Sequence, residues 1–186
     1  MKRNIFILHG AYGNPEEGWF PWLKTELEKM GHEVIVPKFP TPEGQSLESW
    51  NEVFKQYEDK INTESIFVGH SLAPAFILNL LERVEVKIST CFFVAPFVQL
   101  LDNPDFDGIN KTFLKEDFDW GKIKNNCGKF FVYYSDNDPY VAEKFSIFVA
   151  EKTGAERVMV PNAGHFNAKA GYTKFPELLE KINSII

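Results

Sequence analysis

Cysteine is scarce in this 186-residue sequence. It contains two cysteines, Cys91 and Cys127, which are too few for a disulfide scaffold or a zinc ribbon. Positive charge is also limited, since 20 Lys and Arg oppose 26 Asp and Glu and give a net charge of −6. This balance excludes a general attraction to nucleic-acid phosphates or anionic membranes, so we expect neither partner.

Long hydrophobic runs are absent as well. The apolar run near the N-terminus covers only Ile5 to Leu8, which is shorter than the hydrophobic part of a signal peptide and far shorter than a membrane span. No glycine-rich phosphate loop is present, so we expect no cofactor. The acidic stretch 102–107 lacks the spacing of a calcium loop and predicts a solvated turn. We expect a cytoplasmic protein with reduced thiols.

Apolar residues are plentiful, and their order along the chain is informative. Hydrophobic residues make up 44% of the sequence and aromatic residues 15%, which excludes a disordered chain and requires a large core or an apolar cleft. The length fits a single domain over residues 1–186. Short apolar runs predict strands at 5–8, 33–36, 65–69, 88–95, 130–134 and 157–160. Helical spacing predicts helices at 19–30, 47–61, 72–83, 141–152 and 176–186.

This alternation of strands and helices predicts an α/β fold. Its sheet of about six strands should be mostly parallel, with helices on both faces. One stretch departs from this alternation of strands and helices. Residues 96–128 hold no clear core strand, and we expect an irregular insert with a turn-rich piece at 102–108 and a short helix near 120–124.

The strongest chemical signal lies between the third strand and the following helix. There the chain reads Gly69-His70-Ser71-Leu72-Ala73, which is typical of a nucleophile elbow. Small residues two positions before and after the serine let strand and helix approach closely. Ser71 would stand at a helix N-terminus, where backbone N–H groups favour developing negative charge.

A serine nucleophile needs a base, and the chain has four histidines. His70 adjoins the serine and would point away from it, while His9 and His32 lie at the ends of strands in structural positions. His165 follows the sixth strand, at the carboxyl edge where open α/β sheets bind ligands. We therefore predict that His165 is the base.

An acid that orients this base is expected in the loop after the fifth strand. Asp138, which precedes Pro139, is our choice because the fixed φ of proline stiffens the loop. Asp136 is the competitor, and its alternative role is to cap the turn. The order Ser71, Asp138, His165 is the one that this kind of site uses.

An oxyanion hole needs two backbone N–H donors. One is the amide of Leu72, directly after the serine, and the other should come from the loop after the first strand. Gly10 and Gly13 allow that backbone to approach a substrate. Ala11 is the best placed donor, and Tyr12 is the second choice.

Aromatic residues near these loops are candidates for the substrate pocket. We name Tyr12, Trp19, Phe20 and Phe97, because ligand pockets are often lined by aromatic side chains. Trp19 and Phe20 also have the helical spacing of core residues, so both roles remain open.

Motifs spread over nearly the whole chain carry a resemblance. They are His9-Gly10, Gly18-Trp19-Phe20-Pro21-Trp22-Leu23, Gly69-His70-Ser71, Phe118-Asp119-Trp120-Gly121-Lys122-Ile123-Lys124, Ser135-Asp136-Asn137-Asp138-Pro139 and Gly164-His165-Phe166. With them the chain resembles the α/β-hydrolase superfamily, and within it the small serine hydrolases typified by retinoblastoma-binding protein 9. The resemblance implies a three-layer αβα fold, a triad of Ser71, Asp138 and His165, and no metal.

Two features depart from that resemblance. Ala73 stands where much of the superfamily has glycine, and the retinoblastoma-binding sequence Leu-x-Cys-x-Glu is absent, so we expect no partner of that kind. The sequence predicts a serine hydrolase of the carboxylesterase type that cleaves a small ester, thioester or amide. The alternative is a non-catalytic binding module that retains the fold. A thiol enzyme is disfavoured because both cysteines lie away from the predicted loops.

Overall fold

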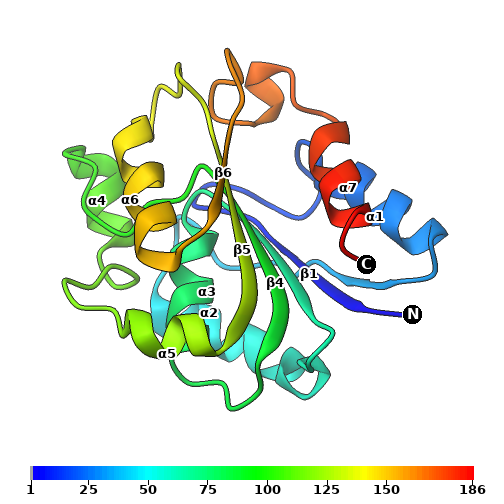
Figure 1. Ribbon diagram of the computed structural model, residues 1–186. Coiled ribbons are helices and arrows are strands. Elements are labelled where there is room, and N and C mark those ends of the chain that lie inside the picture. The colour runs from blue at the N-terminus through cyan, green and yellow to red at the C-terminus, as the bar shows by residue number, and fades with distance from the viewer. Residues whose placement is uncertain (1) are drawn as a thin grey trace.

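The computed structural model describes residues 2–186, which form one parallel sheet of six strands in the order β2-β1-β3-β4-β5-β6 (Figure 1). The strands are β1 (Asn4–Leu8), β2 (Glu33–Ile35), β3 (Ile66–His70), β4 (Ile88–Val94), β5 (Cys127–Tyr134) and β6 (Glu156–Met159). All six predicted strands are present, and the α/β fold class is confirmed.

Helices cover both faces of this sheet. They are α1 (Phe20–Lys29), α2 (Leu47–Phe54), α3 (Ala73–Leu81), α4 (Pro104–Asn110), α5 (Trp120–Asn125), α6 (Glu143–Thr153) and α7 (Pro176–Asn183), with short 3₁₀ helices at 55–60 and 168–170. Buried side chains of α1 and α7 share one core cluster, and those of α2, α3, α5 and α6 share the other. Figure 1 shows these two groups of helices on opposite sides of the strands.

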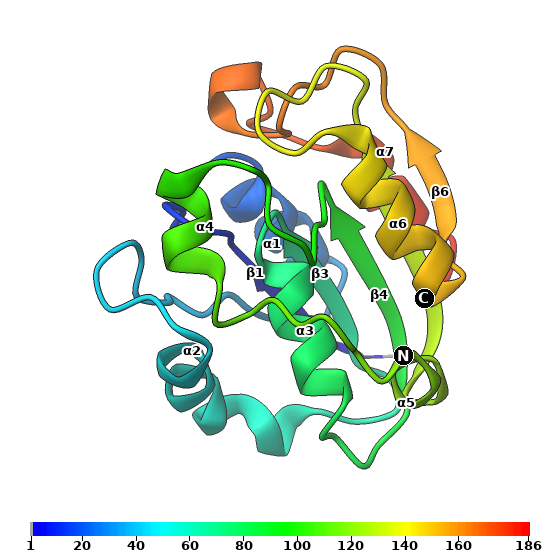
Figure 2. The same cartoon turned by 90° about the vertical axis from the view of Figure 1, so that its left-hand side faces the viewer.

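The centre of the molecule explains its strongly apolar sequence. Every residue of β3 is buried, and so is every residue of α3, which lies in front of β3 and β4 in Figure 2. A strand covered on both faces must be apolar on both, which is why β3 reads as a continuous run rather than an alternation. Because β3 and α3 are both buried, packing fixes the two ends of the turn between them.

The expectation of a turn at 102–108 is wrong in part, because α4 begins at Pro104. Asn103 caps this helix by accepting from the backbone N–H of Asp105 at 3.2 Å, and proline fits the first helical turn because it needs no N–H partner there. The predicted irregular range 96–128 also ends earlier than expected. Strand β5 begins at Cys127, whose backbone is in register with Ile88 of β4.

The helix predicted over 47–61 is shorter than expected. Ser46 caps its start, as a serine side chain can, but the α-helical part ends at Phe54 and continues as a 3₁₀ helix over 55–60. None of the helices within residues 2–186 combines the length and the apolar character that a membrane crossing needs.

Candidate active site

Ser71 occupies a sharp turn between β3 and α3. Its φ of 61° lies in the left-handed region, which a non-glycine residue adopts only where the surrounding structure enforces it. Its N–H donates to the carbonyl of Val94 at 2.8 Å and ties the turn to β4. A Cβ on Gly69 would lie 2.7 Å from Ile77 Cδ1 and 3.1 Å from Pro74 Cδ, so the strand and helix need glycine to cross here.

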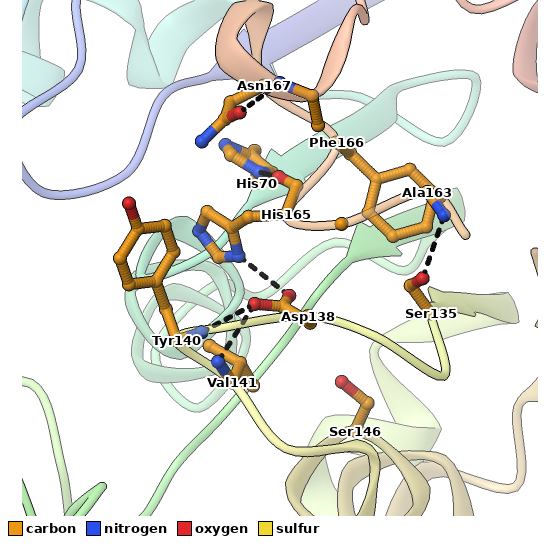
Figure 3. Close-up of polar contacts among 12 residues, drawn as sticks. His70, Ser135, Asp138, Tyr140, Val141, Ser146, Ala163, His165, Phe166 and Asn167 are labelled. Atoms are coloured by element: carbon orange, nitrogen blue, oxygen red, sulfur yellow. Dashed lines mark hydrogen bonds and ion pairs between the residues drawn. The ribbon is translucent and has the colours of Figure 1, made fainter. Parts of the chain in front are cut away.

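His165 and Asp138 are brought together from two different loops. Nδ1 of His165 lies 2.7 Å from Oδ2 of Asp138 (Figure 3), and their side chains are 10% and 1% exposed. The other carboxylate oxygen accepts from the backbone N–H groups of Tyr140 at 2.9 Å and Val141 at 3.0 Å. Asp138 is therefore fixed from its own loop and accepts the Nδ1 proton, which leaves Nε2 of His165 as an acceptor.

Within residues 2–186, Asp136 joins two loops and does not cap its own turn, which was the alternative role considered for it. Its Oδ1 accepts from the backbone N–H of Asn162 at 2.8 Å and so joins the loop after β5 to the loop after β6. Ser135 and Asn137 add to this connection by accepting from Ala163 and Gly164. These bonds hold the His165 loop from one side.

The remaining histidines have structural partners. His9 bonds the carbonyl of Gly10 through Nδ1 and accepts from the N–H of Phe39 through Nε2, and burial lowers its pKa. His70 donates from Nε2 to the carbonyl of His165 at 2.8 Å. Burial, aided by the nearby His165, lowers the pKa of His70 to about 3, so this ring stays neutral. His32 accepts from the N–H of Arg3 at 3.3 Å.

The predicted oxyanion-hole donors lie in two turns, one after β1 and one after β3. Within residues 2–186 the N–H groups of Ala11 and Leu72 have no hydrogen-bond acceptor in the protein, whereas the N–H of Tyr12 donates to Thr41 Oγ1 at 2.7 Å. A Cβ on Gly10 would lie 2.7 Å from Ser71 Cβ and 3.2 Å from Leu72 N. The loop after β1 thus packs directly on the turn that carries Ser71. Within residues 2–186 the amide of Ala11 has no acceptor, whereas that of Tyr12 has one.

A cavity of about 460 Å³ opens between these loops. It lies at the carboxyl ends of the strands, where ligands bind in open α/β sheets. Its lining includes the four predicted pocket residues together with two triad candidates and one oxyanion candidate: Tyr12, Trp19, Phe20, Phe97, Ser71, His165 and Ala11. The structure therefore brings the predicted pocket and the predicted chemistry to one place.

One wall of this cavity is a row of aromatic rings from two loops and the helix α4. Ring centroids lie 5.7 Å apart for Tyr12 and Phe106, 5.8 Å for Phe106 and Tyr140, and 5.1 Å for Tyr140 and His165. We call Tyr12, Phe106 and Tyr140 the aromatic wall. Trp19 lies deeper, is 1% exposed and donates from Nε1 to the carbonyl of Phe166 at 2.8 Å, so it supports the His165 loop as well as lining the cavity.

Sequence reasoning missed several residues that line the cavity, among them two on α4, two in the loop after β5 (Tyr140 and Val141) and the stretch 166–169. The two on α4 are Phe106, which lies in the predicted solvated turn at 102–107, and Asn110, which follows it. A signal for the helix was present: Asn103 before Pro104, with Asp105 and Asp107 in the first turn, is a typical helix start.

Comparison with known proteins identifies the family of the chain. The family model described as serine hydrolase matches residues 5–184, and the chain belongs to that family. The chain is 27% identical to YdeN of Bacillus subtilis, a protein named as a hydrolase, over 99% of this chain and 96% of YdeN. The crystal structure of that protein superposes with a TM-score of 0.92 at 26% identity, covering 99% of this chain and 98% of the other.

Two further relatives extend the comparison. The rat serine hydrolase RBBP9 is 24% identical over 91% of this chain and 87% of its own length, so the resemblance expected from the motifs is confirmed. The carboxylesterase CesB of Bacillus subtilis has the same fold, with a TM-score of 0.66 at 13% identity over 99% of this chain and 83% of that one. The structural neighbours are α/β hydrolases, which agrees with the six-stranded sheet.

Proposed function

We propose that this protein hydrolyses a small ester, thioester or amide through an acyl-enzyme formed on Ser71. The observation that carries this proposal is the 2.7 Å bond between His165 Nδ1 and Asp138 Oδ2, made beside a cavity that Ser71 also lines. Membership of the serine hydrolase family supports hydrolysis as the reaction type.

The mechanism follows from the roles that these side chains can play. His165 Nε2 takes the proton of Ser71 as Oγ attacks the substrate carbonyl, and it returns that proton to the leaving group as the bond to it breaks. Water then attacks the acyl-enzyme by the same proton route and releases the acid. Asp138 holds the Nδ1–H tautomer of His165 and stabilises the imidazolium that forms.

The negative charge of the tetrahedral intermediate needs donors that are already in place. The amides of Ala11 and Leu72 suit this role because neither has an acceptor among residues 2–186. Donors fixed before the reaction stabilise the developing oxyanion without the cost of reorienting, and losing one such donor typically lowers kcat about 10²- to 10³-fold.

The cavity supports a compact substrate with an apolar body. Its volume of about 460 Å³ is at the small end of the range for small-molecule sites, about 300–1,000 Å³. The aromatic wall favours an apolar acyl or leaving group. Since CesB is named as a carboxylesterase, a short carboxylic ester is the first substrate to test.

A fluorophosphonate probe tests the proposal directly. We expect covalent labelling, with the adduct mapped to the peptide that contains Ser71, and hydrolysis of a 4-nitrophenyl ester of a short acid. Ser71→Ala should lose both while keeping its unfolding midpoint. Ser184→Ala, which removes a serine hydroxyl at the far C-terminal end, is the control and should keep both. A folded wild-type protein that takes no label on Ser71 would be the non-catalytic binding module instead.

A further inference from the structure

Asn110, the last residue of α4, is a buried polar side chain that the proposed reaction does not use. It is 1% exposed and lines the cavity. Its Oδ1 accepts from Nε2 of Gln45 at 2.8 Å. Its Nδ2 has no acceptor among residues 2–186. A buried amide with an unpaired donor is rare in proteins and needs a specific explanation.

The orientation of this amide follows from a chain of hydrogen bonds. The backbone N–H of Tyr12 can only donate, so Thr41 Oγ1 accepts from it and gives its own proton to Gln45 Oε1. Gln45 must then present its NH₂ group on the other side. That NH₂ group donates to the carbonyl of Ile109 at 3.0 Å as well as to Asn110. Asn110 is therefore held with its oxygen toward Gln45.

The free Nδ2 of Asn110 keeps a little accessible surface, and Asn110 lines the cavity. Among residues 2–186, the side-chain nitrogens and oxygens that are sealed from solvent without a partner are Arg3 Nε and Asn79 Oδ1. Asn110 Nδ2 is not one of them, so the little surface that Asn110 keeps includes this donor. Phe106, one turn earlier on α4, places an aromatic ring in the same lining, so the donor stands in mainly apolar surroundings.

We propose that Asn110 binds the substrate by donating from Nδ2 to an oxygen of its acyl chain, distinct from the scissile carbonyl. Thr41 and Gln45 are positioning residues that keep the donor directed into the cavity. A nearly buried neutral donor suits a ketone or amide oxygen, because a carboxylate would lose its hydration for one hydrogen bond. The inference rests on the proposed hydrolase function and specifies its substrate class as esters of oxo acids.

Binding measured on the Ser71→Ala variant, which should not hydrolyse substrate, tests this inference separately from the proposed reaction. The probes are the N-methylamides of heptanoic acid and of its 4-, 5- and 6-oxo derivatives, titrated into Ser71→Ala by calorimetry. We expect one oxo amide to bind about 3- to 10-fold more tightly than the plain amide, which is the usual net value of one hydrogen bond. Equal binding of all four amides would overturn the inference.

Two matched variants, made in the Ser71→Ala background, identify the donor. Asn110→Asp keeps the oxygen that Gln45 needs and removes the NH₂ group, so at pH 8 the preference for the oxo amide should fall to about 1. Asn167→Asp is the control, because it makes the same change in the same lining and keeps the oxygen that caps Ala170. It should retain the preference. Loss of the preference in the Asn167 variant alone would assign the donor to Asn167 and overturn the inference.

The role of Thr41 is tested by the same ratio of binding constants. Thr41→Val removes the proton that fixes Gln45, so the preference for the oxo amide should shrink. Thr41→Ser restores the hydroxyl and should recover it, which a loss of packing alone would not predict. In the active protein, 4-nitrophenyl esters of the same acids should show the same order of kcat/KM. Failure of turnover with intact binding preference would count against the proposed hydrolysis and leave Asn110 as a binding residue.

Discussion

Two aspartates two residues apart on the loop after β5 have different surroundings. Asp138 is nearly sealed from solvent and uses both carboxylate oxygens, one on His165 and one on two backbone N–H groups. Asp136 is exposed and holds one backbone N–H of the neighbouring loop. Asp138 therefore holds the imidazole of His165, whereas Asp136 holds the loop that contains Asn162.

This difference predicts unequal effects of the same substitution. Asp138→Asn should lower kcat by up to about 10⁴-fold, because an amide no longer enforces the Nδ1–H tautomer or stabilises the imidazolium. Asp136→Asn keeps an oxygen that can accept from Asn162 and should lose less than about 10-fold. Steady-state kinetics on one activated ester checks this, and similar losses in both variants would remove Asp138 from the orienting role.

The lowered pKa of His70, which precedes Ser71, makes the stability of the fold depend on pH. Burial, aided by the nearby His165, lowers its pKa from the ordinary value of 6.5 to about 3, while the unfolded chain keeps the ordinary value. Because the unfolded state binds the proton more readily, the contribution to stability is complete above about pH 6.5 and is lost as the pH falls toward about 3.

His70→Gln should flatten this part of the pH dependence. Glutamine can still donate to the carbonyl of His165, but it does not titrate. Between pH 7 and pH 4.5 the wild type should lose about 2–3 kcal/mol more unfolding free energy than the variant, since groups common to both cancel. Urea unfolding at the two pH values measures the difference, and parallel losses would show that His70 takes up its proton in the folded state.

At the scale of elements, α4 is the short helix that carries Phe106 and Asn110 into the cavity. The carboxylate of Asp107 accepts from the N–H of Leu101 at 2.8 Å and from that of Asn103 at 3.0 Å. These charge-assisted bonds close the turn that leads into the helix. The helix is otherwise held by few buried residues, since only Asn110 of its seven is buried.

Asp107→Ala should destabilise the whole of helix α4. We expect its backbone amides to exchange with solvent about 10-fold faster and kcat/KM for an ester to fall, because the aromatic wall loses Phe106. Asp105→Ala is the matched control: it removes the same charge from the same turn, while the Asp105 carboxylate accepts no hydrogen bond within residues 2–186. Hydrogen exchange by mass spectrometry distinguishes them, and equal exchange in both variants would contradict the role of Asp107.

At the scale of the whole molecule, the sheet separates two cores. Phe54 of α2 is fully buried in one cluster, and Phe175, at the start of α7, is fully buried in the other. Residues that share no neighbours contribute independently to stability. The two clusters should therefore respond to substitution separately.

Phe54→Leu and Phe175→Leu should each cost about 1–2 kcal/mol of unfolding free energy, and the double variant should lose their sum within about 0.5 kcal/mol. The control pair is Phe54→Leu with Phe76→Leu, whose rings lie 5.5 Å apart in one cluster and should couple. Chemical denaturation of both cycles checks this. Coupling between Phe54 and Phe175 as strong as in the control pair would contradict separate cores.

Much of the fold can be predicted from the sequence, because the patterns that indicate strands and tight turns involve residues close together in the chain. Apolar runs identified all six strands. In a central strand such as β3 the run is continuous because burial on both faces leaves no polar alternative, whereas the edge strand β6 is mostly exposed. Gly69 and Ser71 identified the sharp turn between β3 and α3, because a tight strand-to-helix turn restricts residue types at fixed spacing. The helix α4 was missed because its buried residues are few, although its capping residues were visible in the sequence.

By itself the sequence determined the parallel α/β sheet, the serine hydrolase family and the loops that carry Ser71, Asp138 and His165, because periodicity and motif spacing are properties of neighbouring residues. Only the tertiary structure decided between partners distant in the chain. In the structure Asp138 rather than Asp136 contacts His165, and the amide of Tyr12 donates to Thr41. Asn110 lines the cavity. Those choices depend on hydrogen-bond distances between separate loops, which no local pattern encodes.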